Sequence, residues 1–386
     1  MIKKKILLVE PGYRSLFPPL GLMRISTWRK SIGDLVHFVK ENPPPSYFGY
    51  KQPRLLPNYD EIYITSLFTY HFNEVISCIR KYQSLYPDAK IHVGGILASL
   101  LPDLIKKETG ISPHIGLLEE AEKYPPDYSL FPKLKFSITF TTRGCPRRCR
   151  YCVVPKIEPK FIVRENWEKD IAPHHEKIIF WDNNWLYSPN FHEDIEKLKK
   201  INKPFDFNQG LDCRLFDEEV AKLLSETKIY PLRFAFDGPH HDGYIQNAIK
   251  LAKKHGFSDI RVYVLYNSPE DYDTPEYFYY RIRQLNDLGV AVYPMKYRPI
   301  NSTRRNWVSP NWDKEVLRGV KLALVFFYKD GMIKKGREGF RRIFGESPKE
   351  FISKMKNLNK YDRELWKKKS KERKKKSINR SYKETS

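Results

Sequence analysis

Short apolar segments alternate with amphipathic ones along most of this chain, and this alternation restricts the fold more than any other feature. Apolar runs such as Lys5-Ile-Leu-Leu-Val-Glu predict buried strands, and stretches such as 73–86, with apolar residues at helical spacing, predict helices. Strands that alternate with helices form parallel sheets covered on both faces. The sequence therefore predicts an α/β protein.

The alternation falls into two series, separated at 123–135 by a proline-containing linker that cannot continue a helix. Residues 1–122 predict a doubly wound, Rossmann-like domain. In the second series, residues 136–300, six strands alternate with helices and predict a full or partial parallel barrel. The expected strands of this barrel are 137–141, 177–181, 204–208, 232–236, 260–266 and 290–296.

The chain is strongly basic. The net charge of the 386 residues is +23, and the stretch 363–386 alone holds 11 Lys or Arg and 3 Glu. A like-charge block repels itself and stays solvated, so 363–386 predicts a disordered tail behind a helical C-terminal region at 301–362. The basic surface and tail leave nucleic acid open as a partner.

The cysteines and the N-terminus indicate the compartment. The chain has five cysteines, an odd number with three crowded into eight residues, which is not a secreted disulfide framework. The start has no long apolar core of a signal peptide, and no apolar run is long enough for a bilayer. We expect a soluble, cytoplasmic protein without a membrane partner.

Cys145, Cys149 and Cys152 follow the first strand of the second series. Three thiols at this spacing can converge from one short loop on a single inorganic centre. Structural zinc takes four protein ligands, commonly as two separated pairs, and no second pair is obvious here. A four-iron cluster held by three thiolates leaves one iron open to bind a substrate, so the spacing favours this cluster.

The motif Cys-x3-Cys-x2-Cys, with the aromatic Tyr151 before its last cysteine, resembles the signature of the radical S-adenosylmethionine (SAM) superfamily. This resemblance implies that Cys145, Cys149 and Cys152 are catalytic and ligate a [4Fe-4S] cluster whose open iron binds SAM. An electron donor such as flavodoxin or ferredoxin would then supply the electron that splits SAM into methionine and a 5′-deoxyadenosyl radical. Tyr151 is expected near the adenine.

Asp182, Asn183 and Asn184 follow the second barrel strand. They resemble the turn that contacts the amino group of SAM in the subgroup with a cobalamin-type N-terminal domain. A carboxylate and an amide can accept hydrogen bonds from an ammonium group. A cap rich in Asp and Asn at a helix start is the alternative interpretation.

The third barrel strand leads into a further polar stretch that is similar to the same subgroup. Asn208 and Gln209 are expected at the ribose hydroxyls of SAM, and Arg214 at its carboxylate. Asp212 would alternatively hold Arg214 in place. Catalytic residues of parallel barrels collect at the carboxyl ends of strands, where all of these residues are predicted to lie.

The N-terminal domain resembles the cobalamin-binding domain that precedes many radical SAM barrels. The resemblance rests on Pro18-Pro-Leu-Gly-Leu, Ile64-Thr-Ser and Val93-Gly-Gly. The stretch 9–21 lacks the Asp-x-His-x-x-Gly motif through which some of these domains ligate cobalt. Cobalamin is therefore left open as a further cofactor.

These features predict a radical SAM enzyme of the cobalamin-domain type. Its reaction would be a radical modification, with methylation as one option, of a substrate that the sequence does not identify. The second hypothesis is a non-enzymatic RNA-binding protein with a zinc knuckle, because the charge of +23 and the 14% aromatic residues suit nucleic acid.

Overall fold

The computed structural model describes residues 3–328, 331–334 and 337–358 of the chain. The chain forms two compact units. The first comprises Met1–Leu232 and Arg298–Trp307, and the second comprises Arg233–Tyr297 and Val308–Ser386. The predicted tail at 363–386 lies outside the described residues, as do residues 359–362 of the predicted helical region.

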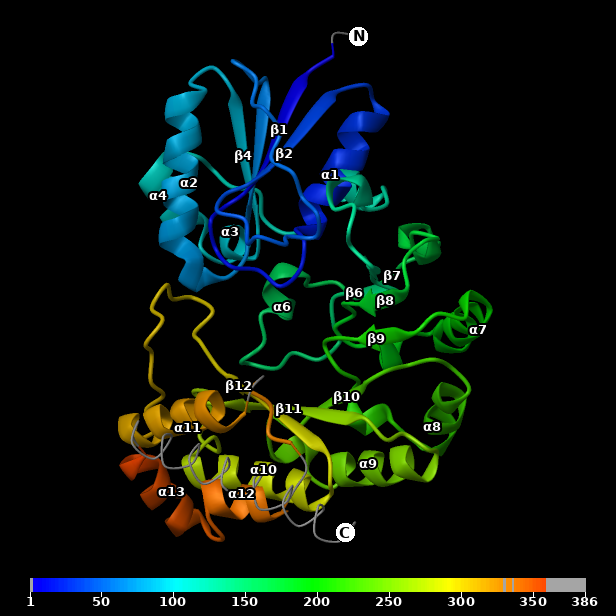
Figure 1. The fold of residues 1–386 in the computed structure, drawn as a ribbon, viewed down its shortest axis with the longest axis vertical. Coiled ribbons are helices and arrows are strands. Elements are labelled where there is room, and N and C mark those ends of the chain that lie inside the picture. The colour runs from blue at the N-terminus through cyan, green and yellow to red at the C-terminus, as the bar shows by residue number, and fades with distance from the viewer. Residues whose placement is uncertain (1–2, 329–330, 335–336, 359–386) are drawn as a thin grey trace, which may run out of the picture. The chain divides into compact units, whose positions relative to one another are not determined.

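The first unit begins with a four-stranded sheet of order β2-β1-β3-β4, in which every pair is parallel. Helices α1 and α2 lie on opposite sides of this sheet (Figure 1). The parallel sheet that the sequence predicts for this part of the chain is confirmed. The elements are β1 (Lys5–Glu10), α1 (Leu20–Ser31), β2 (Leu35–Lys40), β3 (Glu61–Ser66), α2 (Phe72–Leu85), β4 (Lys90–Gly95), α3 (Ile96–Leu100), α4 (Pro102–Thr109) and α5 (Glu119–Glu122).

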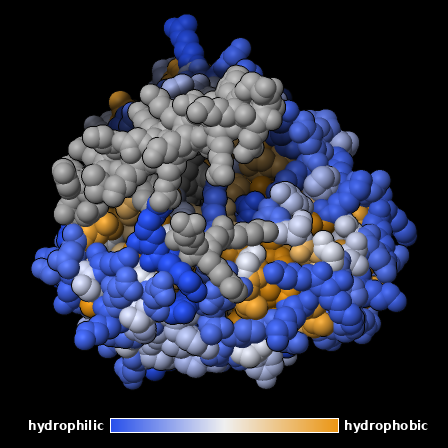
Figure 2. All heavy atoms as spheres, turned by 60° about the horizontal axis from the view of Figure 1, so that its bottom comes forward, coloured by the Kyte–Doolittle hydropathy of each residue, from blue (hydrophilic) through white to orange (hydrophobic). Residues whose placement is uncertain are grey.

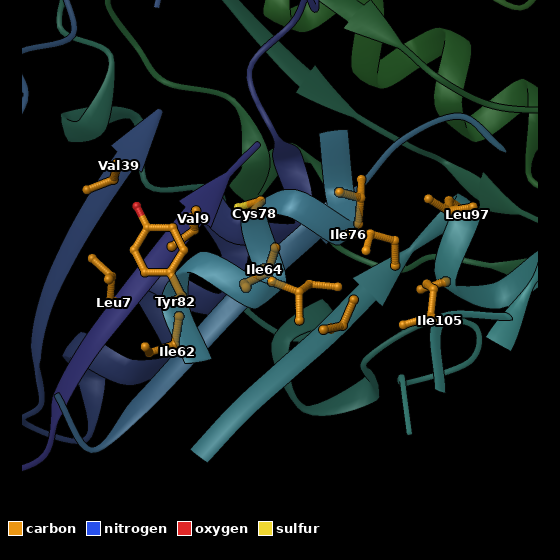
Figure 3. Packing of buried hydrophobic residues seen from close by; sticks show 14 of the residues in the cluster. Leu7, Val9, Val39, Ile62, Ile64, Ile76, Cys78, Tyr82, Leu97 and Ile105 are labelled. Atoms are coloured by element: carbon orange, nitrogen blue, oxygen red, sulfur yellow. The ribbon is translucent and has the colours of Figure 1, made fainter. Parts of the chain in front are cut away.

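The side chains of β1 pack into two separate hydrophobic cores, because successive side chains of a strand point to opposite faces of the sheet. Leu7 and Val9 pack with residues of α2 and α4 (Figure 3), whereas Ile6 and Leu8 pack with residues of α1. All four side chains are fully buried. Each contributes about 1.5–3 kcal/mol through burial, which explains why this run is apolar without alternation.

The first unit also contains a three-stranded sheet of order β5-β8-β9, again with parallel pairing. Its strands and helices alternate as the sequence predicts. A short antiparallel pair, β6 with β7, interrupts the alternation between the first two strands of this sheet. The elements are β5 (Phe136–Thr139), β6 (Thr142–Arg143), α6 (Val154–Ile157), β7 (Ile162–Val163), β8 (Lys177–Phe180), α7 (Phe191–Ile201), β9 (Phe205–Phe207) and α8 (Glu218–Ser225).

The second unit holds the sheet β10-β11-β12, whose last two strands pair in parallel. Helix α10 packs on β11 and β12, and α13 packs on α10 and α11. The elements are β10 (Leu232–Ala235), α9 (Tyr244–Lys254), β11 (Ile260–Tyr266), α10 (Pro275–Asp287), β12 (Ala291–Lys296), α11 (Lys314–Phe327), α12 (Arg337–Phe344) and α13 (Pro348–Asn357).

All six predicted strands of the second series are present, each within two residues of its expected bounds. They are hydrogen-bonded as two three-stranded sheets, with β9 ending the first and β10 beginning the second. The α/β class and the parallel sheets are confirmed. The contact pattern divides the chain after Leu232 rather than at 122 or 136, and the predicted range 136–300 contributes to both units.

The surface reflects the composition. Figure 2 shows one face of the molecule, on which hydrophilic side chains cover most of the described surface and apolar groups show between them. Within the described part of the chain, no helix has the length and apolar character needed to cross a membrane.

Candidate functional site

The three clustered cysteines lie in a loop whose base is closed by the two shortest strands. Thr142 of β6 pairs with Val163 of β7, and Arg143 pairs with Ile162. The intervening residues 144–161, which we call the cysteine loop, therefore leave and re-enter the fold at the same place. Two-residue strands carry too little pattern to be predicted from sequence, so the closure was not foreseen.

Gly144 and Glu158 fix the base of this loop. Gly144 has a φ of +75°, and a Cβ at this position would overlap the backbone carbonyl of Lys160. Its N–H donates to Glu158 Oε2 over 2.7 Å, while Arg143 Nη2 donates to Glu158 Oε1 over 2.6 Å. Glycine reaches this conformation without steric cost, so the backbone can turn back on itself here.

The cysteine thiols are half-buried, and hydrogen-bond donors surround at least one of them. Burial raises the pKa of the Cys145 thiol, and hydrogen bonds from the Arg147 backbone N–H and the Asn184 side chain act in the opposite direction. The N–H of Cys152 donates to the carbonyl of Cys149 over 3.0 Å. Arg214 lies close enough to Cys149 for their charges to interact.

The three thiols lie in one loop, but their sulfur atoms do not converge on a common metal position. Among residues 3–328, 331–334 and 337–358, no three His, Cys, Asp or Glu side chains form a metal-ligating group. Between Cys145 and Val153 the loop has no helix or strand. The donor set itself, three thiols from one closed loop beside N–H and guanidinium groups, matches the chemistry of an anionic iron-sulfur cluster.

Asp212 joins three of the predicted segments. Its buried carboxylate accepts from Arg147 Nε in the cysteine loop (3.2 Å), from Asn184 Nδ2 after β8 (3.2 Å) and from Arg214 Nε (2.7 Å). Burial would raise the pKa of Asp212, but Arg214 and Arg147 outweigh it and hold the pKa below the usual value. The expectation that Asp212 holds Arg214 is confirmed, and its contact with the cysteine loop is new.

Asp182 lies behind the loop rather than within it. Its carboxylate is 1% exposed and accepts hydrogen bonds from the backbone N–H groups and hydroxyls of Thr141 and Thr142. Burial raises the pKa of Asp182 to about 6, although these hydrogen bonds lower it. The residue thus ties the end of β8 to the start of the cysteine loop.

The two following amides contact the loop, Asn183 at Glu158 and Asn184 at the Cys145 thiol. Asn183 Nδ2 donates to Glu158 Oε2 over 3.3 Å. Asn184 Nδ2 donates to Asp212, and Asn184 Oδ1 is a buried acceptor without a hydrogen-bond partner in the part of the chain that the structure describes. A buried acceptor is normally satisfied, so this oxygen is suited to receive a donor from a bound molecule.

The remaining predicted residues lie on the same side of the fold. Tyr151 is half-buried beside Cys152 in the cysteine loop. The N–H of Asn208 donates to the Phe180 carbonyl over 3.0 Å, which extends the pairing of β9 with β8, and Gln209 is exposed. The expected contacts of these side chains with SAM stay predictions.

The carboxyl end of the first sheet adjoins the cysteine loop. At the end of β3, Ser66 Oγ donates to the Gly94 carbonyl over 2.8 Å and accepts from the Ala98 N–H over 3.0 Å. Gly95 has a φ of +107°, and a Cβ on it would overlap Ser66. Helix α3, which starts here, contacts α6, which follows the last cysteine (Figure 1). Ligands of open parallel sheets bind at such carboxyl ends.

Sequence reasoning missed Glu158, although a signal for it existed. Glu158 is the only acidic residue between 144 and 161, a stretch that contains five Lys or Arg. A lone carboxylate among cations is a natural anchor for backbone N–H and guanidinium groups. The partners of Asp182 could not be found in the same way, because they depend on which residues β5 and β8 bring together.

Comparison with known proteins relates this arrangement to a fold. No known protein family matches the sequence, and no curated protein matches it. A solved structure of the radical S-adenosylmethionine methyltransferase TsrM from Kitasatospora setae, with cobalamin and a [4Fe-4S] cluster bound, aligns with a TM-score of 0.59. The alignment covers 78% of this chain and 77% of that chain at 16% identity. This chain shares the fold of that structure.

A second structure of TsrM, with tryptophan substrate and the SAM analog aza-SAM bound, gives the same result. Its TM-score is 0.59, at 15% identity, over 78% of this chain and 75% of that chain. At the level of the fold, the likeness inferred from the cysteine motif is confirmed. In this chain, the cysteine loop follows β5 and lies beside the turns after β8 and β9.

Proposed function

We propose that this chain is a radical SAM enzyme in which Cys145, Cys149 and Cys152 hold a [4Fe-4S] cluster. The observation that carries the proposal is the cysteine loop, a three-thiol segment closed at its base and joined through Asp212 to the turns after β8 and β9. The shared fold with TsrM supports it. When bound, the cluster supplies one electron that cleaves SAM reductively.

Burial raises the pKa of the Cys145 thiol, whereas the hydrogen-bond donors and the cation beside the thiols act in the opposite direction and favour the ionised form. Thiolates are stabilised by nearby cations and by N–H donors. Cys145 accepts hydrogen bonds from two N–H groups, and Arg214 is near Cys149. These residues would lower the free energy of the thiolate form, which is the form that binds metal.

SAM would bind with its amino group at the turn after β8. Asn184 Oδ1, a buried acceptor without a partner among the described residues, would accept from the ammonium group. Arg214 is held by Asp212 through Nε and Nη2 and would contact the SAM carboxylate with its remaining N–H groups. Asp182 would act as a positioning residue, because its carboxylate is already engaged by the threonines.

The proposal extends to cobalamin and methyl transfer. The carboxyl end of the first sheet, at Ser66 and Gly95, would hold cobalamin without the histidine of the Asp-x-His-x-x-Gly motif. The contact of α3 with α6 would bring that end of the sheet to the cysteine loop within the first unit. Methyl transfer is the activity in the name of TsrM and is the first reaction class to test here.

The test is anaerobic reconstitution with iron and sulfide, followed by SAM and a reductant. Mass spectrometry would follow 5′-deoxyadenosine, the product of reductive cleavage, and S-adenosylhomocysteine, the product of methyl loss. We expect product from the parent and none from Cys149→Ala. Cys78→Ala, which removes a buried thiol of α2, is the matched control and should keep the activity.

Two outcomes would contradict the proposal. One is a tightly bound zinc ion with no stable iron-sulfur absorption, which would favour the RNA-binding hypothesis. The other is undiminished SAM cleavage by Cys149→Ala.

A further inference from the structure

A cavity of 370 Å³ lies at the start of α2, apart from the residues proposed to hold the cluster and SAM. One wall comes from the loop after β3 and the first turn of α2, and the other comes from residues 298–307 of the same unit. Arg305 joins the two walls, because it donates to the Tyr70 carbonyl and pairs with Glu74. The residues that line the cavity are Tyr70, Phe72, Asn73, Glu74, Thr303 and Arg305.

The lining side chains carry the groups that recognise a nucleobase. Tyr70 and Phe72 contribute aromatic rings. The Asn73 amide and the Thr303 hydroxyl form no hydrogen bond within the described part of the chain, so both can bind a ligand. An amide presents a donor beside an acceptor, which is the pattern found on the edge of a base. Small-molecule pockets hold roughly 300–1,000 Å³, so this cavity has room for one base.

An aromatic stack adjoins the cavity and reaches the surface. The rings of Phe68 and Tyr70 are stacked with their centroids 5.1 Å apart, and the Arg298 guanidinium lies 3.9 Å from the centroid of the Tyr70 ring. The Phe68 side chain is 42% exposed. An exposed ring that is supported by a second ring is a platform on which any base can stack.

Arginines border this platform. Residues 298–307 include Arg298, Arg304 and Arg305 but no Asp or Glu. The side chains of Arg298 and Arg304 form no hydrogen bond or ion pair with any residue that the structure describes. Glu74, the acidic residue of the cavity, is paired with Arg305. Free guanidinium groups bind phosphate oxygens through two parallel hydrogen bonds, so this border suits a phosphate backbone.

From these observations we infer that the cavity, together with Phe68, Arg298 and Arg304, binds a single strand of nucleic acid. One base would enter the cavity, a second would stack on Phe68, and phosphates would lie at the two arginines. The inference names the substrate class of the proposed enzyme and in that respect rests on the proposed function. Helix α3 contacts both the helical turn Thr69–His71 beside the cavity and α6 after the last cysteine, so a strand held here would lie near the cysteine loop.

A protein partner would use the same positive charge, but the composition of the site favours a nucleic acid. Protein interfaces have an apolar centre with a polar rim. Here one exposed ring, Phe68, lies among arginines, and the adjoining cavity is lined mainly by polar side chains. Stacking combined with cations along a backbone is the usual composition of a single-strand site.

The first experiment tests the platform by fluorescence anisotropy. A labelled single-stranded RNA of about 12 nucleotides is titrated with the full chain, without added cofactors, over a range of salt concentrations. We expect Phe68→Ala to weaken binding by about tenfold at every salt concentration, because stacking is lost and no charge changes. Tyr244→Ala, which removes an exposed aromatic ring of the second unit, is the matched control and should bind as the parent does. Equal losses in the two variants would overturn the inference, as would a parent that binds no strand at low salt.

The same titration tests the phosphate contact through its salt dependence. We expect Arg304→Ala to reduce the slope of log affinity against log salt by about 0.7, the value for one phosphate of a single strand. The matched control is Arg54→Ala, which removes another exposed arginine of the first unit and should keep the parent slope. An unchanged slope in Arg304→Ala would contradict a phosphate contact at this residue. A normal thermal unfolding transition for each variant ties the losses to the surface rather than to misfolding.

The second experiment tests the base in the cavity. Hydrogen bonds to the edge of a base discriminate between bases, whereas stacking and phosphate contacts do not. We therefore expect the parent to distinguish oligo-A, oligo-C and oligo-U by about fivefold or more, and Asn73→Ala to lose this preference. A preference that is unchanged in Asn73→Ala would overturn the role of the cavity.

Two further titrations identify the ligand. RNA and DNA of the same sequence are compared, and tighter binding of one of them names the kind of strand. Cobalamin also contains a base and a phosphate, so it is added as a competitor. Displacement of the strand by an equal concentration of cobalamin would overturn the inference in favour of the nucleotide portion of that cofactor.

SAM cleavage by the reconstituted parent, measured without any strand, keeps the two proposals separate. A parent that binds RNA through Phe68 and Arg304 but gives neither 5′-deoxyadenosine nor S-adenosylhomocysteine would overturn the proposed function and leave the binding site standing. A parent that cleaves SAM but binds neither RNA nor DNA would overturn the inference alone.

Discussion

Single residues at the base of the cysteine loop fix the course of the backbone that carries its thiols. The three cysteines could be singled out as a candidate site, because their spacing is a local property of the sequence. Glu158 was equally local but was overlooked. The role of Asp182 could not be read from sequence, because a carboxylate at a strand end suits both a ligand contact and the buried hydrogen bonds to Thr141 and Thr142 that it makes.

Gly144 gives the sharpest test at this scale. In Gly144→Ala, a φ of +75° costs about 1–2 kcal/mol for any L side chain, and the added Cβ would also overlap the Lys160 carbonyl. We expect several-fold less iron and sulfide per chain after reconstitution. The control is Gly110→Ala, which has the same φ of +75° but open space around the new Cβ. Equal cluster content in the two variants would refute the role of the Gly144 turn.

The raised pKa of Asp182 predicts that the stability of the fold depends on pH. The pKa of this carboxyl group is about 6 in the folded chain and 3.8 ordinarily, so the folded state binds the carboxyl proton more tightly than the unfolded state does. The stability that this proton contributes is lost as the pH rises from about 4 to about 6. Asp182→Asn lacks this titration. Between pH 4 and pH 7 we expect its free energy of unfolding to rise relative to the parent by on the order of 3 kcal/mol.

Urea unfolding of both proteins across this pH range measures that difference. Asp103→Asn, at an exposed position of α4, serves as the control and should follow the parent closely. A difference between Asp182→Asn and the parent that stays constant with pH would show that the burial of Asp182 carries no linkage to folding.

At the scale of elements, helices and strands could be predicted where their buried residues form a clear apolar pattern in the sequence. β11 has the bounds that the sequence predicts, and the other five strands of the second series lie within two residues of theirs, because each is a run of mostly apolar residues. β2 was missed, since only its last three residues are buried and its start is exposed at the edge of the sheet. The β6–β7 pair was missed because strands of two residues each are too short to show an alternating apolar pattern.

The packing of α11 against α13 depends on one glycine. A Cβ on Gly319 would overlap the backbone carbonyl of Met355, so the two helices approach at glycine distance. We expect Gly319→Ala to destabilise the second unit by about 1–3 kcal/mol, measured by thermal unfolding. Gly339→Ala on α12, where the new Cβ meets nothing within 4 Å, should be neutral or stabilising. A similar loss in both variants would argue against this close approach.

At the scale of the whole molecule, the two compact units are not consecutive stretches of the sequence. Residues 298–307 follow β12 of the second unit but belong to the first, and the predicted boundaries at 122, 136 and 300 do not mark this exchange. The reason is that the exchange rests on contacts between residues more than 200 positions apart. Local patterns such as apolar runs and prolines carry no information about such contacts.

Two arginines hold this returning segment to the first unit, and they give a test of its place. The Arg298 guanidinium lies 3.9 Å from the centroid of the Tyr70 ring. Arg305 donates to the Tyr70 carbonyl and pairs with Glu74 of α2. An exposed ion pair and a cation–π contact contribute about 0.5–1 kcal/mol each. We expect the Arg298→Ala/Arg305→Ala variant to be cleaved by chymotrypsin after Tyr297 or Trp307 roughly tenfold faster than the parent, because local opening of this segment becomes easier. Arg304→Ala, exposed in the same segment, should be cleaved at the parent rate. Equal rates for all three proteins would mean that the arginines do not fasten residues 298–307 to the first unit.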